Sequence, residues 1–339
     1  MGIKGLKKII QKYAPGSITD KPSLYNKKIA IDSSILLYKY RYIYKEDNFH
    51  IQGFLYKIIE LLSAGVIPVF VFDGKPPDAK KNTLEKRTET RVKMNERISE
   101  LTVIRNNLGK DNVNVDEFID SDGEECENIK EVKKLNTQIR NIEKNILIVK
   151  KFHSDQVMEF LECLGIPFLQ AISESEETCA YLQKNGIVDY VMSEDTDSLT
   201  FGAKQVLFGE KLYNLDIILK ELEMDYTSFI DFCILCGCDY TSTIPKVGPV
   251  NALKLIKKYK YIENFEMNIP DTFDYKTSRN LFIQNENYNY TSSFNVTSMD
   301  LPKVEEIFER YNLNNYFLEK LKILLIVNGS CTKKNNFTL

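Results

Sequence analysis

Seven carboxylates in the first 240 residues follow short apolar segments, and these residues could together hold metal ions. Asp32 and Asp73 each end a β-branched or aromatic run, KIAID and VIPVFVFD, and ligands bind at the carboxyl ends of parallel strands. The segments ISESEE, SEDTDSLTFG and GCDY supply the other five: Glu174, Glu176, Asp195, Asp197 and Asp239. If they converge, oxygen-only ligation favours two hard cations such as Mg²⁺ or Mn²⁺. Such a pair can activate water and stabilise the leaving oxygen of a phosphodiester, which indicates a two-metal phosphodiesterase.

Each of these carboxylates also has a purely structural explanation. An aspartate after a strand often caps the next helix. Ser173 and Glu176 have the spacing of a capping box, and Asp195 and Asp197 can form an Asx-turn. The repetition of such residues along one chain favours the metal site over a set of unrelated caps.

The distribution of charge fits a nucleic-acid partner better than the net charge of −3 does. Residues 111–127 carry eight acids and no base, so the rest of the chain has a net charge of +5. Residues 75–97 hold eight bases against four acids, and residues 246–260 hold five lysines and no acid. Basic patches of this kind are the footprint of phosphate binding.

The order of apolar runs predicts an α/β architecture of βαβ units. We expect strands at 28–32 and 66–73 and in the runs IPFLQ, IVDYVMS and QVLF, with amphipathic helices between them. Two charged helices are expected at 83–108 and 128–151, and the acidic segment joins them into a helical insertion. From about residue 214 onward, we expect helices and no further strands. The expected divisions are 1–82 (first part of the core), 83–151 (helical insertion), 152–213 (second part of the core) and 214–339 (helical extension). We expect residues 284–298 to form a loop.

Several motifs in order resemble the flap endonucleases, the structure-specific 5′ nucleases related to XPG-type repair nucleases. They are MGIKGL, AIDSSILLY, VFDGKPPDAKK, SESEE, SEDTDSLTFG and GCDYTSTIPKVGPVNA. The resemblance runs from Met1 to about Lys258. A weaker resemblance in the helical pattern continues to about Asn328. It implies a PIN-like, mostly parallel central sheet flanked by helices, with an inserted helical arch and a C-terminal helix-two-turn-helix region.

The resemblance also implies roles for individual residues. The seven carboxylates would bind two Mg²⁺ or Mn²⁺ ions, with Asp195 essential for catalysis, and Lys80 and Arg87 would contact the scissile phosphate. Tyr38 would stack on a base or, alternatively, face the core. The remaining DNA contacts that the resemblance implies are Gly2 near the active site, Arg91, Lys144, Lys150 and Lys151 on the arch, and Lys246, Gly248, Lys254, Lys257 and Lys258 at the helix-two-turn-helix.

Three features depart from the family pattern. The family usually has Gly in the turn that binds K⁺, whereas this chain has Lys246 there. Binding of K⁺ by the turn at Val247 and Gly248 is therefore left open. The acidic segment 111–127 lengthens the arch. The C-terminal KKNNFTL lacks the glutamine and paired aromatics of the peptide that binds the sliding clamp PCNA, so we do not expect clamp docking by that route.

The implied activity is 5′ flap endonuclease and 5′-exonuclease cleavage that leaves 5′-phosphates during DNA replication, repair or recombination. The partner would be branched DNA with a 5′ flap, nick or gap, bound by a monomer. A non-cleaving DNA-binding scaffold and a Holliday-junction resolvase of the same superfamily are the alternatives. No apolar run is long enough to span a membrane, and the N-terminal residues lack the pattern of a secretory signal. We therefore expect an intracellular protein, in the nucleus or a viral replication compartment.

Overall fold

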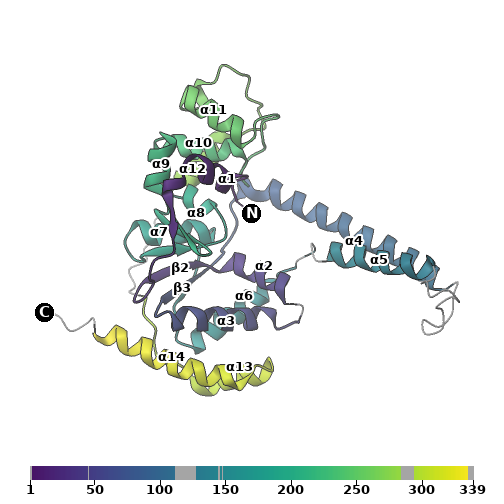
Figure 1. Ribbon diagram of the computed structural model, residues 1–339, viewed down its shortest axis with the longest axis vertical. Helices are drawn as coiled ribbons and strands as arrows, with labels where there is room; N and C mark the ends of the chain where they lie inside the picture. Colours follow the sequence, from purple (N-terminus) through teal and green to yellow (C-terminus); the bar gives the residue numbers. More distant parts are fainter. Residues whose placement is uncertain are drawn as a thin grey trace. The chain divides into compact units, whose positions relative to one another are not determined.

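The computed structural model describes residues 2–44, 46–110, 127–143, 146, 148–283 and 294–334. These residues form two compact units (Figure 1). The first unit combines Met1–Lys80 with Lys150–Leu339, and the second is Lys81–Val149. The first unit contains the whole β-sheet.

A seven-stranded sheet in the order β1-β7-β6-β5-β2-β3-β4 forms the centre of the first unit. The four neighbouring pairs from β6 to β4 are parallel, whereas β7 pairs antiparallel with both β6 and β1. The mostly parallel α/β sheet predicted from the sequence is therefore confirmed. The strands are β1 (Ile18–Asp20), β2 (Lys28–Asp32), β3 (Ile67–Phe72), β4 (Phe168–Gln170), β5 (Tyr190–Met192), β6 (Gln205–Phe208) and β7 (Lys211–Asn214).

Helices cover both faces of this sheet, which explains why its central strands are apolar throughout. All six residues of β3 are buried, as expected of a parallel strand covered on both sides. Helices α2 (Ser33–Ile43), α3 (Phe49–Ser63) and α6 (Lys151–Cys163) pack on one face, and α7 (Ser175–Lys184) packs on the other (Figure 1). The short helices α1 (Leu6–Tyr13) and α8 (Asp197–Thr200) complete this part.

The helical extension follows β7, as the sequence predicted. Helices α10 and α11 pack against each other, α12 packs on α10, and α13 and α14 lie against α6 and α3. The helices are α9 (Leu215–Leu222), α10 (Tyr226–Cys236), α11 (Pro249–Tyr259), α12 (Tyr275–Ile283), α13 (Leu301–Arg310) and α14 (Asn315–Lys334), with 3₁₀ turns η1 (Pro15–Ser17), η2 (Asp78–Lys80) and η3 (Ile262–Asn264).

The second unit is a pair of helices, α4 (Lys81–Lys110) and α5 (Glu127–Glu143). A small core of Leu101, Leu135 and Ile139 holds them together. The second predicted helix, 128–151, was too long, because a new helix starts at Lys151. The amide of Lys150 donates to His153 Nδ1 at 3.0 Å and caps that helix. Most of the acidic segment, residues 111–126, lies outside the described residues.

The sequence did not reveal the short strands β1 and β7. They have only three and four residues, and only one of these seven residues is buried, so neither shows an apolar run. The hairpin between β6 and β7 turns at Gly209, whose φ is 60°, and antiparallel pairing there places β7 between β6 and β1. In the described part of the chain, no helix is long and apolar enough to cross a membrane.

Candidate active site

Asp32 lies at the centre of the carboxylate cluster because β2 is flanked by β5 and β3. Its side chain is 1% exposed. Oδ1 accepts a hydrogen bond from the Ser175 hydroxyl at 2.8 Å, and Oδ2 accepts one from the Ser193 hydroxyl at 2.9 Å. The amide of Ile35 also donates to Oδ1, at 3.4 Å. Asp32 therefore caps α2, which is the structural role expected of an aspartate after a strand. It is also a buried member of the cluster.

Ser175, the first residue of α7, connects two further carboxylates to Asp32. Its amide donates to Asp73 Oδ1 at 2.9 Å, and its hydroxyl lies 3.2 Å from Glu176 Oε2. The capping box proposed for Ser173 and Glu176 is wrong, because Glu174 is the N-cap residue and makes no side-chain cap. The carboxylate of Glu176 is therefore turned toward Asp32 and Asp73 rather than toward the helix end.

Asp195 and Asp197 follow β5 and form the Asx-turn that the sequence suggested. The amide of Asp197 donates to Asp195 Oδ1 at 3.1 Å, and the amide of Asp195 donates to Ser193 Oγ at 2.9 Å. Asp197 Oδ1 is buried and has no hydrogen-bond partner. A buried acceptor without a partner costs free energy, and this one is a candidate position for a cation.

Lys80 supplies the positive charge inside the cluster. Its ammonium contacts Glu174 and lies 3.5 Å from Asp239 Oδ2, and the side chain is 18% exposed. Lys80 belongs to the 3₁₀ turn η2, whereas Arg87 lies on α4, which begins only at Lys81. Pro76 and Pro77 precede that turn and disfavour an earlier helix start.

The electrostatics indicate that the cluster is deficient in positive charge. Burial and the charge of Asp73 raise the pKa of Asp32 to about 7. Burial also raises the pKa of Glu176 well above its ordinary value, as does the charge of Asp32. The pKa of Asp197 is raised well above its ordinary value by burial and by Asp195. Carboxylates in this state favour a divalent cation, which would replace the missing positive charge.

The donor set fits Mg²⁺ or Mn²⁺, since only carboxylate oxygens converge here. Among the described residues, no three metal-ligating side chains yet surround a common point. The Lys80 ammonium instead stands between Glu174 and Asp239. The side chains would have to adjust by local rotation when an ion replaces that ammonium.

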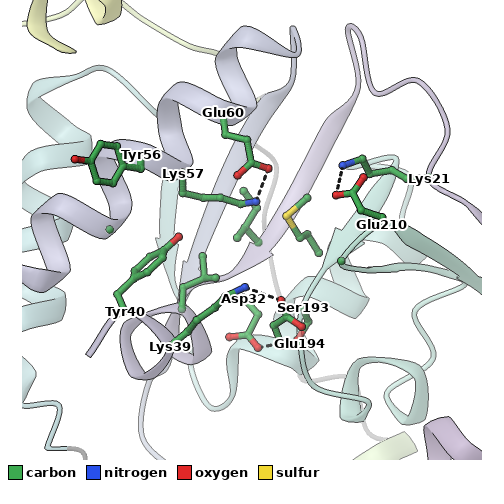
Figure 2. A pocket seen from close by; sticks show the side chains of 15 residues that line it. Lys21, Asp32, Lys39, Tyr40, Tyr56, Lys57, Glu60, Ser193, Glu194 and Glu210 are labelled. Atoms are coloured by element: carbon green, nitrogen blue, oxygen red, sulfur yellow. Dashed lines mark hydrogen bonds and ion pairs between the residues drawn. The ribbon is translucent and has the colours of Figure 1, made fainter. Parts of the chain in front are cut away.

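A cavity of about 320 Å³ reaches Asp32 and Ser193 from the side of α2 and α3 (Figure 2). Each of its three lysines is paired with a glutamate: Lys21 with Glu210 at 2.8 Å, Lys39 with Glu194 at 2.9 Å and Lys57 with Glu60 at 2.9 Å. These three charges are balanced within the cavity, whereas Lys80 contacts carboxylates of the cluster directly.

One of the predicted DNA contacts, Gly2, lies beside this cluster. Gly2 has a φ of 87°, and a Cβ built on it would lie 1.7 Å from Asp195 Oδ1. Tyr38, on α2, is 37% exposed, so its ring is accessible and the core-facing alternative does not hold.

The predicted helix-two-turn-helix lies between α10 and α11. Lys246 has a φ of 65°, a conformation that favours glycine, and its carbonyl accepts a hydrogen bond from Asn251 at 2.9 Å. Gly248 is the N-cap of α11. Lys254 is exposed, whereas Lys257 pairs with Glu223 at 3.3 Å.

Of the predicted arch residues, Arg87 and Arg91 belong to the second unit. Both lie on α4, and Arg91 donates to the Thr88 hydroxyl at 3.1 Å. Lys144 lies outside the described residues. The placement of Lys150 and Lys151 on the arch is wrong, because they stand where α6 begins, in the first unit.

Three polar residues of the cluster were missed from the sequence: Ser175, Ser193 and Tyr240. In the sequence, the two serines are distinguished only by their acidic neighbours in SESEE and SEDTD. That pattern does not indicate hydrogen bonds to Asp32. Tyr240, which follows Asp239, donates its hydroxyl to Glu174. A pairing between residues 66 positions apart leaves no signal in a single sequence.

Comparisons with known proteins agree with this fold. The family model of the XPG N-terminal domain matches residues 1–94, and that of the XPG I-region matches residues 165–239. Flap endonuclease 1 of Brugia malayi is 34% identical over 314 residues, which cover 84% of this chain and 75% of that protein. Flap endonuclease 1 of Glycine max is 36% identical over 313 residues, or 83% and 74% of the two chains.

This chain also resembles a solved structure, the catalytic core of Rad2 in complex with DNA substrate. The two superpose with a TM-score of 0.69 at 22% sequence identity, and the match covers 96% of this chain and 100% of the Rad2 chain. That likeness shows a shared fold. The matching domains place the chain among the XPG-type nucleases. Within that class, it belongs to the flap endonuclease family.

Proposed function

We propose that this chain is a Mg²⁺- or Mn²⁺-dependent 5′ flap endonuclease and 5′-exonuclease that cuts DNA at junctions between single strand and duplex and leaves 5′-phosphates. The observation that carries the proposal is a cluster of seven carboxylates from distant segments, two of which contact the Lys80 ammonium. The seven are Asp32, Asp73, Glu174, Glu176, Asp195, Asp197 and Asp239. Membership of the flap endonuclease family supports it.

The seven carboxylates would hold the divalent ions, which supply Lewis-acid stabilisation and an activated water when bound. The hydroxyls of Ser175 and Ser193 keep Asp32 oriented. Lys80 would move from Glu174 and Asp239 to the scissile phosphate, because an ammonium and metal ions repel each other at the same carboxylates.

The remaining groups of the proposal bind the DNA. Tyr38 offers an exposed ring on which a base can stack. Lys246, Lys254 and the α11 N-terminus at Gly248 would meet duplex phosphates, and Lys257 would do so after leaving Glu223. Arg87, Arg91 and Lys144 would guide the 5′ strand. A K⁺ ion at the Lys246 turn is not part of the proposal, because the lysine already brings positive charge there.

Incubation with Mg²⁺ and end-labelled flap, nicked, gapped and four-way substrates tests the proposal. We expect the flap to be cut fastest, at the junction, and EDTA to abolish cleavage. Asp195→Ala should still bind flap DNA and cut at least about 100-fold more slowly. The matched control is Glu194→Ala, which removes the neighbouring acid paired with Lys39, and it should cut normally. Protein that binds the flap but cuts none of the four substrates would refute the nuclease assignment.

A further inference from the structure

Both oxygens of the Glu174 carboxylate are engaged by side chains from other segments. The Lys80 ammonium contacts Oε1, and the Tyr240 hydroxyl donates to Oε2. Glu174 itself is only 6% exposed, so water does not compete freely for either oxygen. A cation that binds Glu174 must therefore compete with one of these two partners.

Tyr240 is held firmly in place. Its side chain is 5% exposed, and its ring packs edge-on against Phe282 of α12 with 5.1 Å between ring centroids. A tyrosine phenol carries its proton at neutral pH, so Tyr240 acts as a donor to Glu174. Because Tyr240 directly follows Asp239, one loop supplies one carboxylate and orients another.

The two partners of Glu174 differ in charge, and this difference decides which can remain when a cation binds. An ammonium repels a divalent cation at close range. A neutral phenol donates one proton to one lone pair and leaves the other lone pairs of the carboxylate available. Lys80 must therefore leave, whereas Tyr240 can stay.

We infer that Tyr240 is a positioning residue, which holds Glu174 in the orientation needed to bind a divalent cation. This inference rests on the proposed metal-dependent function. Hydrogen-bond partners of metal ligands fix the ligand's orientation, and their loss typically lowers metal affinity about 10- to 100-fold.

Calorimetric titration of the DNA-free, full-length protein with Mn²⁺ tests the role of Tyr240. Tyr240→Phe keeps the ring and its contact with Phe282 but removes the hydroxyl, and should weaken Mn²⁺ binding about 10-fold or more. The matched control is Tyr226→Phe, which removes a hydroxyl that donates to the Thr200 carbonyl at 2.8 Å and should leave Mn²⁺ binding unchanged. Lys80→Met should act in the opposite direction and tighten Mn²⁺ binding.

Cleavage measurements separate positioning from a merely structural role. For Tyr240→Phe, the Mn²⁺ concentration giving half-maximal flap cleavage should rise by the same factor as the dissociation constant, while the rate at saturating Mn²⁺ stays within about threefold. Unchanged Mn²⁺ affinity in Tyr240→Phe, or an equal loss in Tyr226→Phe, overturns the inference while leaving the nuclease proposal intact. Absence of Mn²⁺ binding by the unmodified protein would overturn both.

Discussion

The backbone of Gly2 approaches Asp195 so closely that no side chain fits between them. Gly2 also has a positive φ of 87°, so a substitution there meets backbone strain and a steric clash together. Strain alone costs about 1 kcal/mol for an L-residue, and a clash with a carboxylate must move one of the two groups. Gly186 has the strain without the clash, since its φ is 68° and nothing lies within 4 Å of a built Cβ.

The first prediction compares alanine at these two glycines. Gly2→Ala should lower the rate of flap cleavage about 100-fold, because a displacement of about 1 Å at a reacting centre has an effect of that size. Gly186→Ala should cost about 1 kcal/mol of stability and leave the cleavage rate unchanged. Cleavage rates and thermal unfolding of both variants provide the measurement, and equal rates in the two would show that the contact with Asp195 is unimportant.

Sequence patterns located the seven carboxylates but not the residues that hold them. Asp32 and Asp73 were recognisable because each follows an apolar strand, and the position of a strand end is a local property. The partners of Asp32, Ser175 and Ser193, come from segments more than 140 residues away. Such pairings depend on strand order, which no local pattern encodes.

At the scale of elements, a buried ion-pair network joins α10, η3 and α12. Asp231 is fully buried and receives two hydrogen bonds from Arg279, each 2.6 Å long. The amide of Ile262 donates to the same carboxylate at 3.1 Å, and Glu263 also pairs with Arg279 at 2.6 Å. The network therefore fixes α12, and with it Phe282, on the helix that leads to Asp239 and Tyr240.

The second prediction follows from the burial of Asp231. Arg279→Met should lower the free energy of unfolding by about 3 to 5 kcal/mol, because it leaves a buried carboxylate without its partner. The control is Arg310→Met, which breaks an exposed pair with Glu306 and should cost at most about 1 kcal/mol. Urea denaturation of both variants measures the difference. The double variant Asp231→Leu with Arg279→Met should recover much of the loss, and a double variant as unstable as the single one would contradict this explanation.

The strands that the sequence predicted and those it missed differ in burial. β2, β3 and β6 are apolar because helices cover the sheet on both faces, and the limits of these strands fell within one residue of the predicted ones. β1 and β7 lie at the antiparallel edge and show no such signal. The helix predicted to run from 128 to 151 was too long for a related reason. The start of α6 is marked by a hydrogen bond between Lys150 and His153, and apolar periodicity does not reveal such a cap.

At the scale of the whole molecule, the chain interrupts its catalytic fold with an independent helical unit. Lys81–Val149 has its own small core, and all seven carboxylates and Lys80 belong to the other unit. The metal-binding part of the proposed site therefore does not require α4 or α5, whereas Arg87 and Arg91 are contributed only by α4.

The third prediction replaces residues 81–149 with a Gly/Ser linker of about 20 residues, which spans about 25 Å on average. The shortened protein should unfold cooperatively and keep its Mn²⁺ affinity within about threefold, but cut flaps at least about 100-fold more slowly because Arg87 is lost. Deleting only residues 111–126 is the control and should preserve or raise cleavage, since it removes acidic charge. Loss of cooperative unfolding in the linker variant would show that the helical unit supports the sheet.

The positions of the seven carboxylates along the chain set the earliest point in its synthesis at which the proposed site can be complete. β2 lies between β3 and β5, and the carboxylates around it extend from Asp32 to Asp239. At about 5 to 20 residues per second, a ribosome needs about 10 to 40 s to pass from the first to the last. Throughout that interval, the nascent chain would carry an incomplete set of the proposed metal ligands, and one edge of β2 lacks its partner strand until β5 emerges. Under the proposed assignment Asp239 completes the set, so we expect no DNA cleavage before it has left the ribosome.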